Sequence, residues 1–285
     1  MWKEKLCLNL IGNSGIQTKE LVRLYRRVGF EGFFVNWSED TDLKELRECS
    51  DTEGMLFQSV HAPYLKAADM WRGGEAARIA KEELFRCLED TAEIGVELVI
   101  CHTWIGFNTG EKPNEVGIES YRSVVEKARE LNIKIAFENT EGEEFLHAIL
   151  DAFKGYRNVG FCWDSGHEMC YNRSKDMLAL YGDRLFSTHL NDNLGIKDYG
   201  GNITYLDDLH LLPFDGICDW NDAARRLTKC GYGGELTFEL TTVSKRGRHE
   251  NDVYAEMGIE RYITEVYKRA CRVATLISSK KESEI

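Results

Sequence analysis

The sequence predicts an α/β fold, a single (β/α)8 TIM barrel. Short runs rich in apolar, β-branched and aromatic residues alternate with amphipathic helical segments eight times along the 285 residues. Six of the expected strands end in His, Glu or Asp, which suits a ring of parallel strands whose carboxyl ends share one mouth. No shift in composition marks a second domain. A doubly wound open sheet is the alternative, but it would gather such residues in one crevice.

The first half of the chain supplies four of the strands, which are expected over 6–11, 32–37, 55–60 and 98–101. Thr18 is a suitable N-cap for a helix over 19–28, and Gly29 ends it. Further helices are expected over 42–49 and 75–94. The helix over 75–94 is the clearest, because its apolar residues recur at helical spacing along one face.

The second half repeats the pattern with strands expected over 133–137, 159–163, 185–188 and 235–238. Helices are expected over 116–131, after Gly142, over 219–230 and over 253–277. The last residues, 278–285, are expected to form a frayed tail. We therefore predict one domain over 1–285.

Composition and charge narrow the possible settings and partners. The net charge of −12 disfavours nucleic acid and anionic membrane surfaces as partners. No run of about 18 apolar residues indicates a membrane span. The nine cysteines are scattered without a Cys-x-x-Cys pair, and the N-terminus does not resemble a signal peptide. These features predict a cytoplasmic protein without disulfides.

Four residues directly after apolar strand-like runs form the strongest candidate site: Glu138, Asp164, His189 and Glu239. In a barrel, these positions project into a common mouth. Three carboxylates and one imidazole make an oxygen-rich set that suits Mn²⁺, Mg²⁺ or Co²⁺, and the imidazole also permits Zn²⁺. Each carboxylate alone could instead cap a helix or pair with a cation. The four together predict a divalent-metal site.

A second group of residues near the expected strand ends has two possible roles: His61, His102, His167, Asp208 and His210. They would bind substrate hydroxyl groups, or they would complete additional metal sites. Trp37 and Trp104 are either core residues or substrate-binding side chains that stack on a sugar. The basic cluster at 245–249 reads as a solvated loop or as a phosphate contact.

The ordered motifs Ser59-Val60-His61-Ala62-Pro63-Tyr64, Phe137-Glu138-Asn139-Thr140, Trp163-Asp164-Ser165-Gly166-His167, Thr188-His189-Leu190-Asn191-Asp192 and Thr237-Phe238-Glu239-Leu240 resemble the xylose isomerase-like TIM barrel superfamily. This superfamily contains sugar phosphate isomerases and epimerases and the related apurinic endonucleases. Resemblance to the ketose epimerase branch implies an enzyme with one divalent ion, preferably manganese. Its small carbohydrate substrate would be a sugar, a sugar phosphate or a cyclitol ketone. Glu138 and Glu239 would be the acid–base pair acting through an enediolate, and His167 would hold a substrate hydroxyl group.

Resemblance to the apurinic endonucleases implies a different reaction, phosphodiester hydrolysis at three zinc ions. The same four residues together with His61, His102, His167, Asp208 and His210 match the ligand types of that branch. The first sixty residues do not resemble the endonucleases, and the segment 211–216 is more similar to the sugar isomerases. We therefore favour carbohydrate chemistry. A sugar-binding protein without turnover is a third reading, against which the glutamate pair argues. A homodimer through the last helix is also expected.

Overall fold

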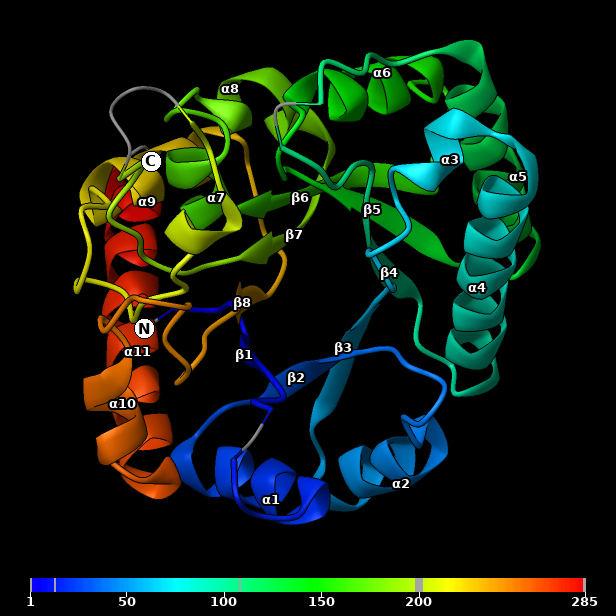
Figure 1. Ribbon diagram of the computed structural model, residues 1–285. Helices are drawn as coiled ribbons and strands as arrows, with labels where there is room; N and C mark the ends of the chain where they lie inside the picture. The colour runs from blue at the N-terminus through cyan, green and yellow to red at the C-terminus, as the bar shows by residue number, and fades with distance from the viewer. Residues whose placement is uncertain (1, 13, 108, 198–201, 284–285) are drawn as a thin grey trace.

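Eight parallel strands form one ring with helices on its outside (Figure 1). The computed structural model describes residues 2–12, 14–107, 109–197 and 202–283. The hydrogen-bonded strand order is β7-β6-β5-β4-β3-β2-β1-β8, and a parallel bridge between Leu190 and Phe238 joins β7 to β8. The strands are β1 (Leu6–Asn9), β2 (Gly32–Asn36), β3 (Leu56–His61), β4 (Leu98–His102), β5 (Lys134–Glu138), β6 (Val159–Asp164), β7 (Leu185–His189) and β8 (Leu236–Phe238). The predicted single (β/α)8 barrel is confirmed.

The helices that connect successive strands follow the expected order. They are α1 (Thr18–Val28), α2 (Leu43–Glu53), α3 (Asp69–Arg72), α4 (Gly74–Glu93), α5 (Glu115–Glu130), α6 (Glu143–Ala152), α7 (Ser165–Cys170), α8 (Met177–Tyr181), α9 (Trp220–Lys229), α10 (Asp252–Glu256) and α11 (Ile259–Ser283). Two 3₁₀ helices are η1 (Gly182–Arg184) and η2 (Tyr205–Asp207). The short helices α3, α7 and α8 were not expected from the sequence, because each is too brief to show helical periodicity.

The core lies between the outer face of the strands and the inner faces of the helices. Helix α1 buries Leu21, Val22, Leu24 and Tyr25, and Gly29 ends it with a positive φ of 123°. A smaller apolar cluster is formed by Ile100, Ala136 and Cys162. Each lies two residues before the end of its strand, so it faces the inside of the ring together with the strand-end side chain. Because the interior is plugged at this level, the side chains at the carboxyl ends of the strands form the floor of a cavity rather than the wall of a pore.

The C-terminal region differs from the expectation of one helix over 253–277 and a frayed tail from 278. Gly258, with a φ of 74°, separates α10 from α11, and α11 continues to Ser283. Lys281 explains the extension, because its ammonium group donates to the carbonyl oxygen of Tyr232 at 3.0 Å and also pairs with Glu4. Residues 284–285 lie outside the described part of the chain. The extent of one domain over 1–285 stays a prediction.

All nine cysteines are free thiols in this structure. No helix within the described ranges is both long enough and apolar enough to cross a bilayer.

Candidate metal centre

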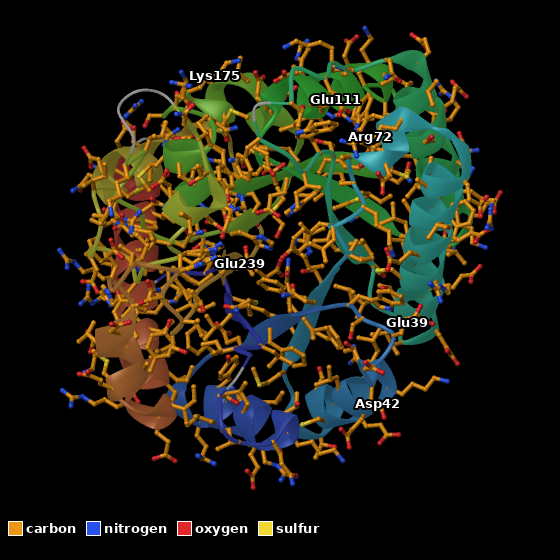
Figure 2. The ribbon with its side chains drawn as sticks, viewed as in Figure 1. Glu39, Asp42, Arg72, Glu111, Lys175 and Glu239 are labelled. Atoms are coloured by element: carbon orange, nitrogen blue, oxygen red, sulfur yellow. The ribbon has the colours of Figure 1, made fainter. Side chains whose placement is uncertain are left out.

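The four residues of the predicted metal site meet at the carboxyl ends of neighbouring strands. Glu138, Asp164 and His189 are the last residues of β5, β6 and β7, and Glu239 directly follows β8. Each offers one ligand atom, and these atoms all lie within 4.8 Å of one another. The first three side chains are fully buried, whereas that of Glu239 is 17% exposed. Figure 2 shows Glu239 toward the middle of the barrel, with Glu39 and Asp42 at its edge.

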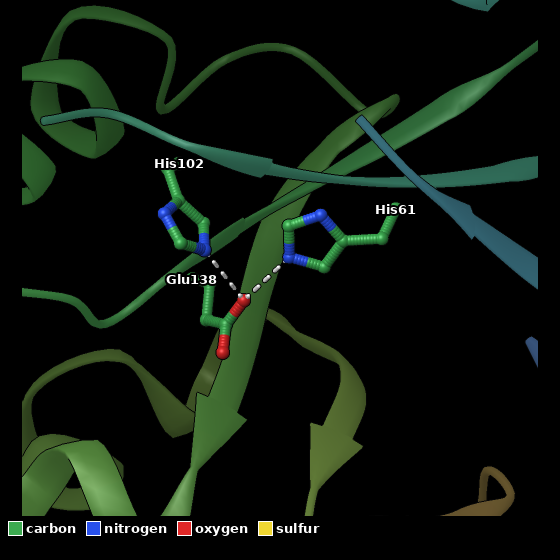
Figure 3. Close-up of side chains that lie close together, drawn as sticks. All are labelled: His61, His102 and Glu138. Carbon is green, nitrogen blue, oxygen red and sulfur yellow. Dashed lines mark hydrogen bonds and ion pairs between the residues drawn. The ribbon is translucent and has the colours of Figure 1, made fainter. Parts of the chain in front are cut away.

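Two histidines form a second group around the same glutamate. His61 ends β3 and His102 ends β4, and the Nε2 atom of each lies 3.3 Å from Oε2 of Glu138 (Figure 3). The ligand atoms of these three residues also lie within 4.8 Å of one another. The ends of three adjacent strands therefore supply a second set with the composition of a metal site.

A third group comes from helix α7, which follows β6, and from the long connection between β7 and β8. Nε2 of His167, on α7, lies 3.4 Å from Oδ1 of Asp208, and Nε2 of His210 lies 2.9 Å from the same oxygen. The second ring nitrogen of His210 lies 2.9 Å from the carbonyl oxygen of Glu239. The ligand atoms of these three side chains also lie within 4.8 Å of one another. All nine candidate ligands predicted from the sequence thus lie in one connected cluster.

Glu138 is the hub that connects the three groups. Its Oε2 faces His61 and His102, and its Oε1 lies 3.2 Å from Nδ1 of both His167 and His189. Burial acts to raise the pKa of this carboxyl group, but the surrounding imidazoles outweigh it and hold the pKa well below the usual range. Both oxygens of Glu138 are therefore engaged by nitrogen atoms.

The pKa values of the cluster reflect several carboxyl groups buried next to imidazole rings. Burial raises the pKa of Asp164 to about 6. Burial disfavours the charged forms of His189 and His210, but the adjacent carboxylates outweigh it and raise their pKa values to about 10 and about 9. Burial acts to raise the pKa of Glu239, but His189 lowers it to about 2. In the metal-free protein, protonated imidazoles therefore balance the negative charge of the buried carboxylates. A bound divalent ion would supply this positive charge and displace the protons.

Two orphaned atoms support this fit to metal ions. Nδ1 of His167 and Oδ1 of Asp208 are buried, and neither has a hydrogen-bond partner among the described residues. Nδ1 of His167 nevertheless lies 3.2 Å from Glu138, and Oδ1 of Asp208 lies 2.9 Å from His210 and 3.4 Å from His167. Buried polar groups without partners are costly, and a shared ion would satisfy them. The donor set of carboxylate oxygens and imidazole nitrogens suits Mn²⁺, Zn²⁺ or Co²⁺.

Amide side chains behind the cluster fix the orientation of Asp164. Asn191 donates from Nδ2 to Oδ2 of Asp164 at 2.9 Å. Asn139 accepts the Asp164 backbone N–H at 2.8 Å and donates to the Asp164 carbonyl oxygen at 2.9 Å. Gly166 leaves room for this arrangement, because a Cβ atom there would lie 1.8 Å from Oδ1 of Asn191. Such outer hydrogen bonds hold metal ligands in one orientation.

The loop that carries Asp208 and His210 is fastened by Asp192. Its Oδ1 accepts the backbone N–H groups of Asn193 and Cys218, and its Oδ2 accepts those of Phe214 and the Trp220 indole, at 2.8–3.0 Å. The backbone of Asp192 also pairs with Leu211 in both directions. A fully buried carboxylate thus ties residues 211–220 to the end of β7.

A cavity of about 370 Å³ opens above the cluster. Its lining includes Glu239 and most of the histidines, together with a rim of Tyr64, Leu65, Ile105, Phe107, Tyr171 and Tyr205. The ring of Tyr64 stacks on His102 at 4.7 Å, and that of Tyr171 lies 4.8 Å from His167. Lys245 is the one Lys or Arg among the described lining residues, and its Nζ lies 3.1 Å from Oδ2 of Asp208. The mouth is a small pocket rather than a basic groove.

The structure corrects the expectation that Trp37 and Trp104 line this pocket. The indole of Trp37, 6% exposed, points outward and donates to Asp90 of α4 at 2.9 Å. Trp104, 2% exposed, stacks on Phe145 with 4.0 Å between ring centroids, and it donates to the carbonyl oxygen of Gly106. Neither lines the cavity. Side chains alternate along a strand, so Asn36 faces the cavity while Trp37 packs outside.

Sequence reasoning missed Glu141, Tyr64, Tyr171 and Lys245 as lining residues. Tyr64 and Glu141 each lie three residues after a candidate ligand at a strand end, His61 and Glu138. This short separation in sequence could have identified them as residues near the cavity. Tyr171 follows the unexpected helix α7, and Lys245 lies in the basic cluster that was read mainly as a solvated loop. No sequence pattern singles these two out.

Comparison with known proteins identifies relatives of the same architecture. The family described as xylose isomerase-like TIM barrel matches residues 22–261. The uncharacterized protein y4fM of Sinorhizobium fredii is 33% identical over an alignment of 160 positions, which covers 52% of this chain and 48% of that protein. The match therefore spans about half the length of that curated relative.

Solved structures with the same fold include a zinc-containing IolI protein, which is 19% identical over 95% of this chain and 98% of its own, with a TM-score of 0.75. D-Psicose 3-epimerase from Clostridium cellulolyticum, solved with D-tagatose, is 15% identical over 95% of this chain and 99% of its own, with a TM-score of 0.72. An L-ribulose 3-epimerase is 13% identical over 99% and 97% of the two chains, with a TM-score of 0.71. These likenesses establish the shared fold.

Proposed function

The chain belongs to the xylose isomerase-like TIM barrel family, and from that premise we propose that it is a divalent-metal-dependent isomerase or epimerase of a small carbohydrate. One observation carries the proposal: Glu239 is the only one of the four predicted ligands that lines the cavity, while Glu138, Asp164 and His189 lie beneath it. A metal bound by these four residues would have one carboxylate ligand, that of Glu239, exposed to a substrate in the cavity. Structural relatives named as psicose and ribulose epimerases support the substrate class.

The proposed ion site consists of Glu138, Asp164, His189 and Glu239, with manganese as the preferred ion and zinc, cobalt or magnesium as alternatives. When bound, the ion would polarise a substrate carbonyl group and make the adjacent C–H bond more acidic. The chain's part is to move the proton. Oε2 of Glu239 is held 3.0 Å from Nδ1 of His189, which fixes the carboxylate at the cavity floor, where it would remove that proton.

The cavity wall supplies the proposed substrate contacts. His61, His102 and His167 all line the cavity and would donate to or accept from substrate hydroxyl groups. Tyr64 and Tyr171 would pack against apolar faces of a sugar ring. The size of the pocket suits a single sugar unit. A cytoplasmic location and a homodimer complete the proposal.

Hydrogen exchange with solvent tests this function. The protein, loaded with Mn²⁺, is incubated in heavy water with D-fructose, D-psicose, D-tagatose, L-ribulose and their phosphate esters. Deuterium should enter the carbon next to the carbonyl group of at least one of these ketoses, because proton removal precedes inversion or isomerisation. The absence of deuterium from every ketose and ketose phosphate would reject the proposal.

A second candidate is phosphodiester hydrolysis at a three-metal centre, and the three connected ligand sets specifically favour it. In this reading each candidate set would hold one ion, and the third ion would be held by His167, Asp208 and His210. Metal content separates the two candidates. One ion per chain together with deuterium incorporation supports the isomerase, whereas three zinc ions per chain together with cleavage of bis(p-nitrophenyl) phosphate supports the hydrolase.

A further inference from the structure

The cavity contains one carboxyl group that neither the candidate metal sets nor a cation of the chain accounts for. Its acidic lining residues are Asp208, Glu239 and Glu141. Asp208 and Glu239 are candidate metal ligands, and Lys245 pairs with Asp208 at 3.1 Å. Glu141 belongs to none of the three candidate ligand sets found within the described residues. Its charge therefore calls for a partner from outside the chain.

The burial of Glu141 makes this lack of a partner costly. Its side chain lies in the loop after β5 and is 7% exposed. Among the described residues, no Lys, Arg or His forms an ion pair with it, whereas the more exposed Glu143 and Glu144 on α6 each pair with a lysine. Burial raises the pKa of the Glu141 carboxyl group, and the N–H of Gly106 offsets this only partly. A buried carboxylate is stable only beside a cation, so a positively charged ligand group would complete this site.

The position of the Glu141 carboxyl group is fixed by neighbouring loops. Its Oε1 accepts the backbone N–H of Gly106 at 2.9 Å. The preceding carbonyl group, that of Thr140, accepts a hydrogen bond from Asn172 at 2.9 Å. No other residue in the described ranges donates to the Glu141 side chain, so its Oε2 is available to a ligand in the cavity. One oxygen thus orients the group, and the other faces the binding site.

Aromatic rings border Glu141 on the cavity wall. Phe107 follows the glycine that binds Glu141, and its ring lies 5.6 Å from that of Tyr171, with 55° between the ring planes. Burial raises the pKa of the Tyr171 hydroxyl, and the negative charges of Asp208 and Glu141 add to this effect, so the phenol lies close to both carboxyl groups. An ammonium group is attracted by a carboxylate and by the faces of aromatic rings alike. This wall therefore suits a cation better than a neutral hydroxyl group.

We propose that Glu141 binds a protonated amino group of the substrate, which is therefore an amino sugar or an aminocyclitol ketone. This inference deepens the proposed isomerase or epimerase function and rests on it. Aliphatic amines are positively charged at neutral pH. Strand β5 stands three places from β8 around the ring in one direction and five in the other, so the loops after these strands face each other across the mouth. The amino group would lie on the Glu141 side, and the reacting carbon would lie on the Glu239 side.

Binding of matched amine and hydroxyl probes tests this site. The protein, loaded with Mn²⁺, is titrated in a calorimeter at pH 7 with D-glucosamine and D-glucose, with 1-amino-1-deoxy-D-fructose and D-fructose, and with scyllo-inosamine and scyllo-inositol. The wild type should bind the amine of at least one pair about 10- to 100-fold more tightly than its parent, because hydrogen bonds to charged groups are stronger than neutral ones. The N-acetyl derivative of that amine keeps the nitrogen but not the charge, and it should lose this gain. An equal affinity for amine and parent in all three pairs would reject the site.

Two variants assign the preference to Glu141. Glu141→Gln keeps an oxygen for the Gly106 N–H but removes the negative charge, and it should lower the preference for the amine about 10-fold or more. A merely structural role would instead weaken the amine and its parent by the same factor. Glu144→Gln makes the same change on α6, where Glu144 pairs with Lys112, and should match the wild type. Metal content is measured in every sample. A preference that survives intact in Glu141→Gln would assign the amine to the ion and reject Glu141.

The failures of the two proposals differ. If the wild type exchanges hydrogen in a neutral ketose but binds no amine more tightly than its parent, the ammonium site is rejected and the isomerase function stands. If the wild type prefers an amine through Glu141 but exchanges no hydrogen in any ketose, 1-amino-1-deoxy-D-fructose included, the ammonium site stands as a ligand site and the isomerase function is rejected.

Discussion

Replacement of Asp192 by Asn is expected to detach the loop that carries Asp208 and His210. Each oxygen of Asp192 accepts two N–H groups. In the Asp192→Asn variant an NH₂ group takes the place of one oxygen. Whichever way the amide is oriented, this NH₂ group faces two N–H donors and loses both hydrogen bonds. A hydrogen bond to a charged group contributes about 1.5–3 kcal/mol, and the loss of two therefore amounts to about 3–6 kcal/mol. The stability of a whole domain is about 5–15 kcal/mol. The loop should therefore open before the barrel unfolds.

Hydrogen exchange, metal binding and urea unfolding would each detect the opening of this loop. Hydrogen exchange at the backbone N–H of Leu211, which donates to the Asp192 carbonyl oxygen at 2.9 Å, should accelerate strongly in Asp192→Asn. The set that contains Asp164 and His189 should keep its ion, and in the three-metal reading the ion of the His167, Asp208 and His210 set should bind more weakly. Unfolding in urea should show a stability loss no larger than the estimated 3–6 kcal/mol.

Asp219→Asn is the matched control. Asp219 caps α9 and accepts the backbone N–H groups of Asn221 and Asp222 at 3.0–3.1 Å. Asn and Asp are almost equally good at an N-cap, so this variant should change stability by less than about 0.5 kcal/mol. The reasoning is refuted if Asp192→Asn shows the same Leu211 exchange, the same unfolding free energy and the same metal content as the wild type.

Three further outcomes are expected. Binding of the proposed ion at pH 7 should release about one proton per chain, because the pKa of His189, about 10, leaves this ring protonated in the metal-free protein. Binding should therefore strengthen as the pH rises toward this value. A binding enthalpy that does not vary with the ionisation enthalpy of the buffer would contradict the release of a proton. Asn191→Ala, which removes the donor to Asp164, should weaken metal binding about 10- to 100-fold in a chelator competition, whereas Asn158→Ala, far from the cluster, should not. Trp104→Ala should lower the unfolding free energy in urea by about 3–5 kcal/mol without changing metal content, and a loss below about 1 kcal/mol would show that the stacked indole is not a core element.

The fold and the ligand cluster could be predicted from the sequence because both depend on local signals. Each of the eight expected strands is present within a few residues of its predicted bounds. A parallel barrel brings strand ends together whatever the loops do, which is why Glu138, Asp164 and His189 meet as expected. His210 and Asp208 also join the cluster, although they lie in a loop whose course no periodicity reveals.

The remaining details depend on tertiary contacts that the sequence does not display. Whether Trp37 faces the cavity or α4 is decided by the pleat of β2, whose pairing with β3 shifts register between Phe33 and Phe34. The extension of α11 depends on Lys281 reaching Tyr232, far away in sequence. The crowding of four imidazoles around Glu138 likewise appears only when the ends of several strands and the segments after them are assembled.

The most direct test of carbohydrate proton transfer at this site is the rate of deuterium incorporation into a ketose by the wild type and by Glu239→Gln, with metal content measured in the same samples. The wild type should incorporate deuterium. Glu239→Gln should retain the ion through Glu138, Asp164 and His189 but lose exchange by about 10²-fold or more. A Glu239→Gln variant that exchanges at the wild-type rate, with its metal bound, would contradict the assignment of Glu239 as the group that removes the proton.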